Sequence, residues 1–464
     1  MTRRCLAIAL SLLIIPATLV AGPVQPATAA SVIHVSVGSL HACGLTSVGT
    51  AYCWGGNSNA QVDGSQITRP TPTAVSGGFT FSALSPGDSH TCGLTSAGAA
   101  YCWGYNVDGE RGDGTTNTGY SPTAVSGGLT FTSITAGAYH TCGLTSAGAA
   151  WCWGSNAEGQ LGDNTIATRL TPVAVQQGAM TFSSIAAGGA QTCGLTSAGA
   201  AWCWGYNGEG ALGDNTTTNR WTPTAVSGGL TFTSLTGGVS NHTCGLTSGG
   251  AAYCWGYNAF GQLGDNTTTQ RNVPTAVSGG LTFTQIAPGP HHTCGLVSGG
   301  TAYCWGSNAN GELGDGTTTE RHAPTAVSGS LSFNAVSAGG NHWVVEDSTC
   351  GVSAGNIYCW GDNTYGQLGD GTTTEEHAPV LNWLMETDAG VAVSFGMDPQ
   401  LTFTVSSVAG ALGCGDVTTT VASTTNAVSL RPPQVVTRSV LRLMPQLPGR
   451  SAGGGPRAGM LGWR

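Results

Sequence analysis

The sequence predicts an all-β fold, because a glycine- and threonine-rich phrase with two cysteines and several aromatic residues occurs seven times. The first cysteines of the copies follow one another at intervals of 49, 50, 51, 51, 50 and 56 residues: Cys43, Cys92, Cys142, Cys193, Cys244, Cys294 and Cys350. No helical periodicity interrupts this array. Repeats of this length and composition are typical of closed rings of small sheets. We therefore expect a seven-bladed β-propeller of four-stranded blades over residues 31–381, followed by a short β-rich extension.

Residues 1–30 are predicted to be a secretory signal peptide. Arg3 and Arg4 precede an apolar run over residues 6–20, and residues 27–30 read Ala-Thr-Ala-Ala, a small-residue cleavage site. No later segment approaches the roughly eighteen apolar residues of a membrane span. We therefore expect an extracellular protein, secreted or held at the cell surface, with no membrane span once the signal is removed.

One copy shows how each blade is built. In the third copy, residues 133–137 form a short strand, and residues 141–145 and 149–153 form a hairpin around a three-residue loop that ends in glycine, a favoured hairpin form. A loop over residues 154–168, rich in Gly, Asn and Asp, leads to a strand that starts at Pro172. The first copy begins at Val32, so each copy provides all four of its strands and no exchange of strands between the termini is expected.

The spacing of the two cysteines in a copy predicts a disulfide. A hairpin centred on Ala147 places Cys142 opposite Cys152 at a non-hydrogen-bonded site, where facing side chains come closest. The seventh copy loses one residue from both the loop and the spacing and keeps this register. The predicted pairs are Cys43–Cys53, Cys92–Cys102, Cys142–Cys152, Cys193–Cys203, Cys244–Cys254, Cys294–Cys304 and Cys350–Cys359. Zinc is the alternative, since His, Cys and Cys recur together, but no copy offers a fourth ligand.

The chain changes character after the repeats. Residues 382–430 alternate apolar and polar positions and are predicted to form a β-rich extension or an incomplete domain. Cys414 in this segment is either a free thiol or pairs between chains. Residues 431–464 hold six Arg and no acid, and we expect a disordered basic tail. An out-of-frame translation product would give the same abrupt change.

The charge balance restricts the class of partner. The chain has no Lys, and all 23 acidic residues lie between Asp63 and Asp416, together with only six of the 14 Arg. Nucleic acids and anionic membranes attract clustered basic side chains. We therefore expect neither as a partner, and we expect a monomer.

The segment Trp153–Val175, which reads WGSNAEGQLGDNTIATRLTPVAV and follows AGAYHTCGLTSAGAAWC, resembles the regulator of chromosome condensation repeat. The resemblance covers about 350 residues and implies a seven-bladed propeller. Its best-known members act on a nuclear GTPase and contact chromatin, whereas other members with this fold are secreted bacterial proteins, including an inhibitor of β-lactamase. The cysteine pairs depart from intracellular members and make this chain similar to a secreted, bacterial-type member. Fold alone does not transmit function.

Three polar series recur with the repeat and are interpreted as structural. A histidine, replaced once by Gln191, precedes the cysteine of most copies, and these histidines could alternatively form a metal or acid–base site near the axis. A loop Asp recurs in every copy and is expected to cap local amides. An Arg that recurs before the last strand is expected to pack against a neighbouring blade's loop. The histidines are His41, His90, His140, His242, His292 and, beside an insertion, His342. We assign no catalytic residue, no metal ligand and no cofactor.

Function is expected where the copies differ. Aromatic residues in the variable loops after the Trp-Gly pair are the candidate partner anchors: Tyr105, Tyr206, Tyr257 and Phe260. They predict a non-enzymatic binding scaffold for a protein or a surface glycan. One alternative is a secreted enzyme, a lyase or hydrolase with a histidine or metal site near the axis, and another is an inhibitor of a secreted enzyme.

Overall fold

The computed structural model describes residues 31–238, 241–341 and 344–382, together with the backbone of three later strands. The predicted signal peptide, His342, Cys414 and the basic tail lie outside these described residues. Contacts divide the chain into two units, 1–390 and 391–464. In the second unit, β29 (Ala392–Phe395), β30 (Thr402–Ser406) and β31 (Thr418–Thr420) form an antiparallel sheet in that order.

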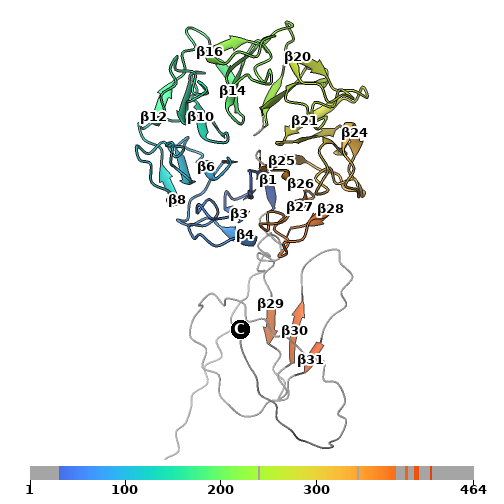
Figure 1. Ribbon diagram of the computed structural model, residues 1–464. Coiled ribbons are helices and arrows are strands. Elements are labelled where there is room, and N and C mark those ends of the chain that lie inside the picture. Colours follow the sequence, from blue (N-terminus) through green and yellow to red (C-terminus); the bar gives the residue numbers. More distant parts are fainter. Residues whose placement is uncertain are drawn as a thin grey trace, which may run out of the picture. The chain divides into compact units, whose positions relative to one another are not determined.

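The first unit is a ring of seven blades, each an antiparallel sheet of four consecutive strands (Figure 1). Blades 1 to 3 consist of β1 (Val32–Val37), β2 (His41–Thr46), β3 (Ala51–Gly55), β4 (Arg69–Ala74); β5 (Ala83–Pro86), β6 (His90–Leu94), β7 (Ala100–Gly104), β8 (Gly119–Ala124); and β9 (Ser133–Ala136), β10 (His140–Leu144), β11 (Ala150–Gly154), β12 (Arg169–Ala174). Blades 4 and 5 consist of β13 (Phe182–Ala187), β14 (Gln191–Thr196), β15 (Ala201–Gly205), β16 (Arg220–Ala225); and β17 (Ser234–Gly237), β18 (His242–Leu246), β19 (Ala252–Gly256), β20 (Arg271–Ala276). Blades 6 and 7 consist of β21 (Phe283–Pro288), β22 (His292–Val297), β23 (Ala302–Gly306), β24 (Arg321–Ala326); and β25 (Ala335–Asn341), β26 (Glu346–Ser353), β27 (Asn356–Gly361), β28 (Glu376–Leu381). The predicted seven-bladed, all-β fold is confirmed.

The register of the central hairpin is the predicted one. In blade 3, Cys142 faces Cys152, and Gly148 closes the loop with a φ of 74°, a left-handed conformation that glycine adopts without steric cost. The fourth strand starts earlier than predicted, at Arg169 rather than Pro172. The reason is a bulge in β12: Cys152 pairs with Val173 and Gly154 with Arg169, so residues 170–172 of β12 lie opposite Trp153 alone.

A disulfide joins the two cysteines of every copy in the structure. The Cα atoms of each pair are 4.1 Å apart, the close spacing of a non-hydrogen-bonded pair. All fourteen bridged cysteines are buried, at 0–1% exposure.

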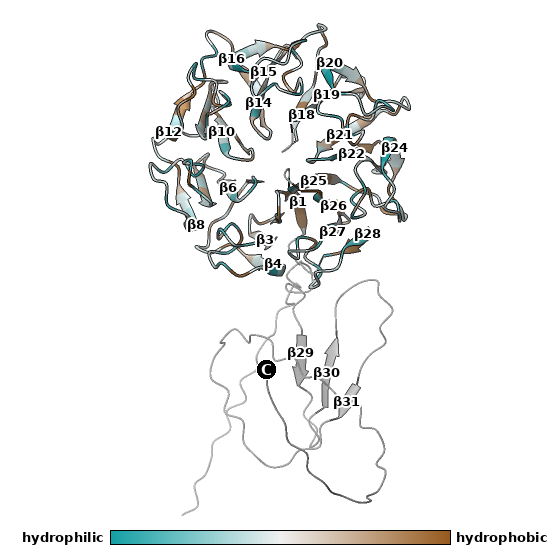
Figure 2. Cartoon of the chain, in the orientation of Figure 1, coloured by the Kyte–Doolittle hydropathy of each residue, from teal (hydrophilic) through white to brown (hydrophobic). Residues whose placement is uncertain are grey.

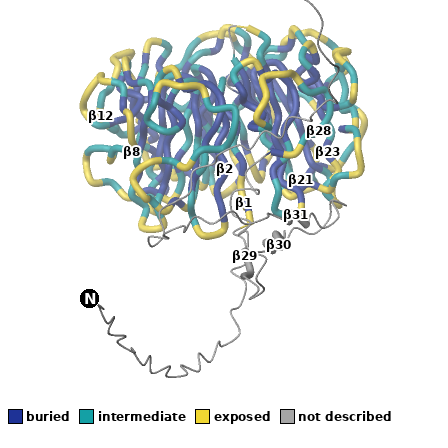
Figure 3. The backbone as a smooth tube through the Cα atoms, turned by 90° about the horizontal axis from the view of Figure 1, so that it is seen from below, coloured by how far each residue is buried: buried dark blue, intermediate teal, exposed yellow. Residues whose placement is uncertain are grey.

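The core is divided among the junctions between blades. At six junctions, the disulfide of one blade packs with a Phe and the Trp of the next blade; in one of them Cys142 and Cys152 meet Phe182 and Trp204. At the junction of blades 7 and 1, the bridge packs with Val32 and Trp54 instead. The seven junction tryptophans are at most 1% exposed: Trp54, Trp103, Trp153, Trp204, Trp255, Trp305 and Trp360. Hydrophobic and hydrophilic residues are mixed within each blade (Figure 2), and buried strands lie between exposed loops on two faces (Figure 3).

The ring closes between blades 7 and 1 without strand exchange. The indole Nε1 of Trp54 in blade 1 donates to the carbonyl of Gln367 in blade 7 at 2.8 Å. The backbone N–H of Gly371 donates to the carbonyl of Pro70, also at 2.8 Å. The same indole–carbonyl bond links every other pair of neighbouring blades. The closing junction differs in its polar pair, because Ser348 and Ala42 stand where most other junctions carry a His and a Thr.

Candidate functional site

The recurrent histidines lie in the junctions between blades. His140 is fully buried, and its Nε2 lies 2.8 Å from the hydroxyl of Thr192 in the next blade. That hydroxyl donates to the carbonyl of Gln160 at 2.8 Å, so it accepts a hydrogen bond from the protonated Nε2 of His140. Trp204 donates to the same carbonyl at 3.0 Å. The His–Thr contact recurs in four other junctions, at 2.8–3.0 Å, as His41–Thr91, His90–Thr141, His242–Thr293 and His292–Thr349.

Burial keeps several of these histidines uncharged. It lowers the pKa of His41 to about 3, of His90 to about 4 and of His140 to about 3, and in His41 and His140 the charge of His90 lowers it further. The Nδ1 atoms of all three are buried without a hydrogen-bond partner. A neutral imidazole enclosed between two sheets is a structural element, as the sequence predicted.

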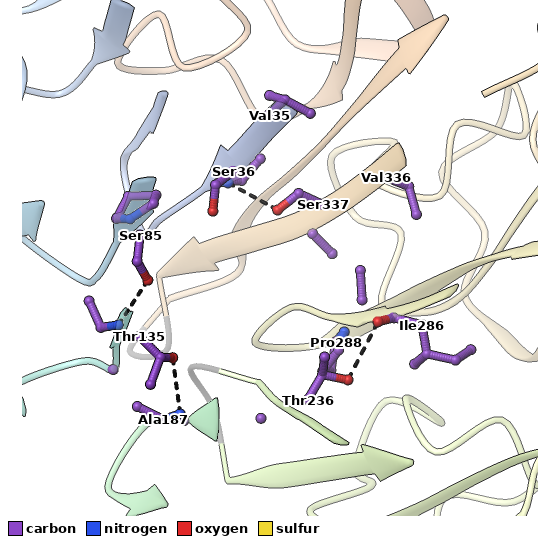
Figure 4. Close-up of a pocket in the computed structure, with 18 of the residues that line it drawn as sticks. Val35, Ser36, Ser85, Thr135, Ala187, Thr236, Ile286, Pro288, Val336 and Ser337 are labelled. Carbon is purple, nitrogen blue, oxygen red and sulfur yellow. Dashed lines mark hydrogen bonds between the residues drawn. The ribbon is translucent and has the colours of Figure 1, made fainter. Parts of the chain in front are cut away.

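The axis of the ring holds a cavity of about 230 Å³ that the innermost strands line (Figure 4). None of the five junction histidines lines it. Two of its hydroxyl groups accept hydrogen bonds from the backbone of the adjacent blade, Ser85 from Ala136 at 2.8 Å and Thr135 from Ala187 at 3.1 Å. The Thr236 hydroxyl donates to the carbonyl of Ile286 at 3.4 Å. Among the described residues, no group of three His, Cys, Asp or Glu side chains could hold a metal ion.

The recurrent Asp and Arg belong to one motif within each blade. Asp163 accepts hydrogen bonds from the backbone and hydroxyl of Thr165 at 3.0 and 2.7 Å, the expected capping turn. Arg169 forms an ion pair with the same carboxylate at 2.6 Å. The prediction that the Arg packs against a neighbouring blade's loop is therefore wrong, because an Asp six residues earlier holds it in its own loop. The same pair occurs as Asp63–Arg69, Asp214–Arg220, Asp265–Arg271 and Asp315–Arg321.

Blade 2 keeps the ion pair with a displaced cation. Gly119 stands where five blades carry the Arg and blade 7 carries Glu376, and Arg111 stands where the other six blades carry Val or Leu. The Arg111 guanidinium reaches Asp113 at 2.9 Å. A Cβ atom on Gly119 would lie 2.2 Å from that guanidinium, so the glycine leaves the space that the displaced Arg fills.

The two faces of the ring differ in charge. The connections from the first to the second strand and from the third to the fourth strand of a blade meet on one face, where the Ser155 amide donates to the Tyr139 carbonyl at 2.8 Å. In the described residues these connections hold many carboxylates and Arg111, and five further Arg at the start of a fourth strand pair with an Asp of the connection. Carboxylates outnumber these Arg, and we call this the acidic face. Its carboxylates are Asp63, Asp88, Asp108, Glu110, Asp113, Glu158, Asp163, Glu209, Asp214, Asp265, Glu312, Asp315, Glu320, Asp362, Asp370 and Glu375. The other connections of the seven blades contain no charged residue and form a neutral face of Ser, Thr, Gly and apolar residues.

All four predicted aromatic anchors lie in connections of the acidic face, and each is half-buried. The Tyr206 hydroxyl donates to Glu209 at 3.1 Å, and burial together with the charge of Glu209 raises the pKa of Tyr206 to about 12. Tyr257 and Phe260 meet edge to face at 6.3 Å between ring centroids. Tyr105 lies in blade 2, where burial and the carboxylates of Glu110, Asp108 and Asp88 raise its pKa.

A histidine–carboxylate cluster at the junction of blades 6 and 7 escaped the sequence analysis. Asp347 is fully buried and lies 3.3 Å from Nδ1 of His291 and 3.2 Å from Nδ1 of His292. Burial alone would raise the pKa of Asp347, but the charge of His291 and the hydrogen bonds of both histidines lower it below its usual value. Phe260 packs edge to face on His291 at 5.0 Å. The signals were the His-His pair, unique to the sixth copy, and the acidic insertion, unique to the seventh.

The sequence of this chain matches family models and proteins of known sequence. The family model of the RCC1-like domain matches residues 14–345, and that of the regulator of chromosome condensation (RCC1) repeat matches residues 354–396. The chain is 33% identical over 97 residues to the RCC1 domain-containing protein RUG3, mitochondrial, of Arabidopsis thaliana, and the matched segment covers 20% of this chain and 22% of RUG3. It is 36% identical over 112 residues to the probable E3 ubiquitin-protein ligase HERC4 of Rattus norvegicus, covering 23% of this chain and 10% of HERC4. The match thus spans about a fifth of RUG3 and a tenth of HERC4.

Solved structures share the fold. Human WBSCR16 superposes with a TM-score of 0.62 at 20% identity, over 70% of this chain and 87% of that one. Yeast RCC1 (Prp20), solved with Kap60, gives a TM-score of 0.63 at 21% identity, over 71% and 82% of the two chains. No helix in the described part of the chain has the length and apolarity needed to cross a membrane.

Proposed function

Because the chain belongs to the family of RCC1-like domains, we propose that it is an extracellular, non-enzymatic scaffold that binds a protein partner on its acidic face. Propellers of this family commonly mediate protein interactions. The observation that carries the proposal is the difference between the two faces, since one carries the carboxylates and the aromatic anchors and the other carries no charge.

The acidic face favours a partner with exposed Lys or Arg. Complementary charge steers association and rejects partners of like charge. Half-buried tyrosines beside carboxylates add rigid contact area, and a cation can also stack on their rings. This preference supports a basic protein over a neutral glycan.

The extracellular location rests on two features of the chain. The first thirty residues have the pattern of a secretory signal. Seven disulfides, one in each blade, are typical of proteins that fold in an oxidising compartment.

The enzymatic alternative gains no support from the histidines on which it depended. The five described junction histidines are fully buried and donate to a threonine of the next blade, so a substrate has no access to them. The inhibitor alternative is one form of protein binding and depends on the identity of the partner.

The test is affinity capture from native culture fluid with three forms of the full chain. These are the wild type, an acidic-face variant that combines Asp108→Asn with Glu209→Gln, and a neutral-face variant, Ser146→Lys. A partner retained by the wild type and by the neutral-face variant but lost by the acidic-face variant supports the proposal. Loss on the neutral-face variant alone would assign binding to the other face.

A further inference from the structure

The seven junctions can be compared at two equivalent positions on the rim of the acidic face. At each junction, a loop of one blade packs on the second residue of the fourth strand of the next blade. Gly109 of blade 2 contacts Leu170 in this way, and Gly159 of blade 3 contacts Trp221. Each contact is close, since a Cβ on either glycine would lie 2.4–2.6 Å from the apolar side chain.

Only two neighbouring junctions combine a carboxylate with an apolar residue at these positions. The residue before the loop glycine is Asp108 at the junction of blades 2 and 3 and Glu158 at that of blades 3 and 4. The facing residues are Leu170 and Trp221. From the junction of blades 4 and 5 onward, the corresponding pairs are Glu209 with Asn272, Phe260 with His322, Asn310 with His377 and Tyr365 with Pro70. At the junction of blades 1 and 2, Asn59 accompanies Tyr120.

The apolar residues of this sector reach solvent. Trp221 is 48% exposed, and Val107 and Ile166, which belong to the loops that pack on Leu170 and Trp221, are each 55% exposed. Exposed large apolar side chains that gather on one sector are typical of interaction sites. Half-exposed Trp is also among the residues that most often dominate binding energy.

The carboxylates of the sector have no cation in the described structure. Each of the six Arg among the described residues forms an ion pair with an Asp of its own loop, and neither Asp108 nor Glu158 takes part in one. Glu158 instead accepts a hydrogen bond from the side-chain amide of Asn219 at 2.5 Å, beside Trp221. The sector therefore presents negative charge and apolar area side by side in two adjacent copies.

We propose that this sector, defined by Val107, Asp108, Glu158, Ile166, Leu170 and Trp221, binds a segment of a partner protein in which Lys or Arg side chains alternate with apolar ones. The inference rests on the proposed function and narrows it to blades 2–4. Two successive acid–apolar pairs match two basic and two apolar side chains of one segment. A nucleic acid or an anionic membrane would be repelled by the same carboxylates.

The experiment measures binding of short dye-labelled synthetic peptides to the full chain by fluorescence anisotropy. One peptide alternates Arg with Leu, a second alternates Arg with Ser, and a third alternates Glu with Leu. The protein variants are Trp221→His and the pair Asp108→Asn with Glu158→Gln. Trp221→His places in blade 4 a residue that the equivalent positions of blades 6 and 7 already carry, so folding is expected to persist. His377→Ala, at the equivalent position of blade 7, is the matched control.

We expect the Arg/Leu peptide alone to bind well. Trp221→His should weaken it by about tenfold or more, and the double carboxylate variant should weaken it and flatten its dependence on salt. His377→Ala should leave it unchanged. Equal binding of the Arg/Ser peptide, or equal loss in His377→Ala, would overturn the proposal, as would binding of a neutral oligosaccharide that is lost in Trp221→His.

The same measurements separate this proposal from the broader one. If the Arg/Leu peptide binds and its binding is lost in Glu209→Gln, which lies outside the sector, but is kept in Trp221→His and in Asp108→Asn with Glu158→Gln, the acidic face stands and the sector is wrong. If no variant of the acidic face affects binding, both proposals fail.

Discussion

Replacing His140 with glutamine, the residue that the fourth copy carries as Gln191, removes one titrating group from a buried junction. In the folded protein, burial lowers the pKa of His140 to about 3. In the unfolded chain the pKa is about 6.5. Because the folded pKa is depressed, the unfolded state binds the proton first as the pH falls. The stability associated with neutral His140 is therefore complete above about pH 6.5 and is lost progressively below it.

The magnitude follows from the difference between the two states. At pH 5 nearly all unfolded chains carry a protonated histidine and the folded protein carries a neutral one, which lowers the free energy of unfolding by about 2 kcal/mol relative to pH 7. Since pH 5 lies well above the folded pKa, the result depends almost entirely on the unfolded pKa. His41 and His90, with folded pKa values of about 3 and 4, add similar losses.

The assay is guanidinium denaturation with the disulfides intact, followed by tryptophan fluorescence at pH 7 and pH 5. Wild type and His140→Gln share every other titrating group, so the difference between their pH dependences isolates this histidine. We expect the variant to lose about 2 kcal/mol less than the wild type between the two pH values. Thr192→Val, which removes the hydroxyl partner but keeps the histidine, is the control and should retain the wild-type pH dependence. An identical pH dependence of His140→Gln and wild type would refute the assignment of a buried neutral histidine.

Three further outcomes are expected. Replacing Cys142 and Cys152 by Ala should lower the free energy of unfolding by about 2–3 kcal/mol, because the bridge closes a short loop, and thermal denaturation without reductant measures this; no change would mean that the bridge does not form. Arg111→Leu should lower the free energy of unfolding by about 1–3 kcal/mol, because it leaves the nearly buried Asp113 without its ion pair. Adding Gly119→Arg should recover most of that loss. If the double variant does not recover it, the interpretation that Arg111 replaces the missing Arg at position 119 is wrong. Glu110→Gln should raise the free energy of unfolding by about 2–3 kcal/mol at pH 7 and by little at pH 4. The reason is that burial, together with the charge of Asp108, raises the pKa of Glu110 to about 7, so the folded state opposes its ionisation. An equal gain in stability at both pH values would exclude this cause.

Much of one blade could be predicted because its determinants are local. The short loop at Ser146–Gly148 sets the hairpin register, and this register fixes which cysteines face each other. Seven near-identical copies then fix the number of blades. The loop Asp could also be assigned to a capping turn, since its partners lie two residues away.

The features that could not be predicted depend on contacts between copies, or on the pairing of the recurrent Asp with the recurrent Arg. The constant spacing from Asp163 to Arg169 was a signal for their ion pair, and the exchange of Arg from position 119 to 111 in blade 2 supported it. The His–Thr contact crosses a junction, and no pattern within one copy reports what the next copy places opposite. The cluster around Asp347 joins two irregularities in different copies, which become neighbours only when blades 6 and 7 pack together.

The burial of the seven disulfides has a consequence for the order in which the protein assembles. In the finished ring the cysteines are covered by the neighbouring blade, so an oxidant has no path to a thiol that is still reduced. Each bridge must therefore form while its hairpin is open, before the next blade is added. The chain favours this order, because the correct partner is nine or ten residues away and the next hairpin's cysteine about forty, a difference in loop-closure entropy of about 1 kcal/mol. Oxidation blade by blade, in step with the emerging chain, is thus the path that the geometry permits.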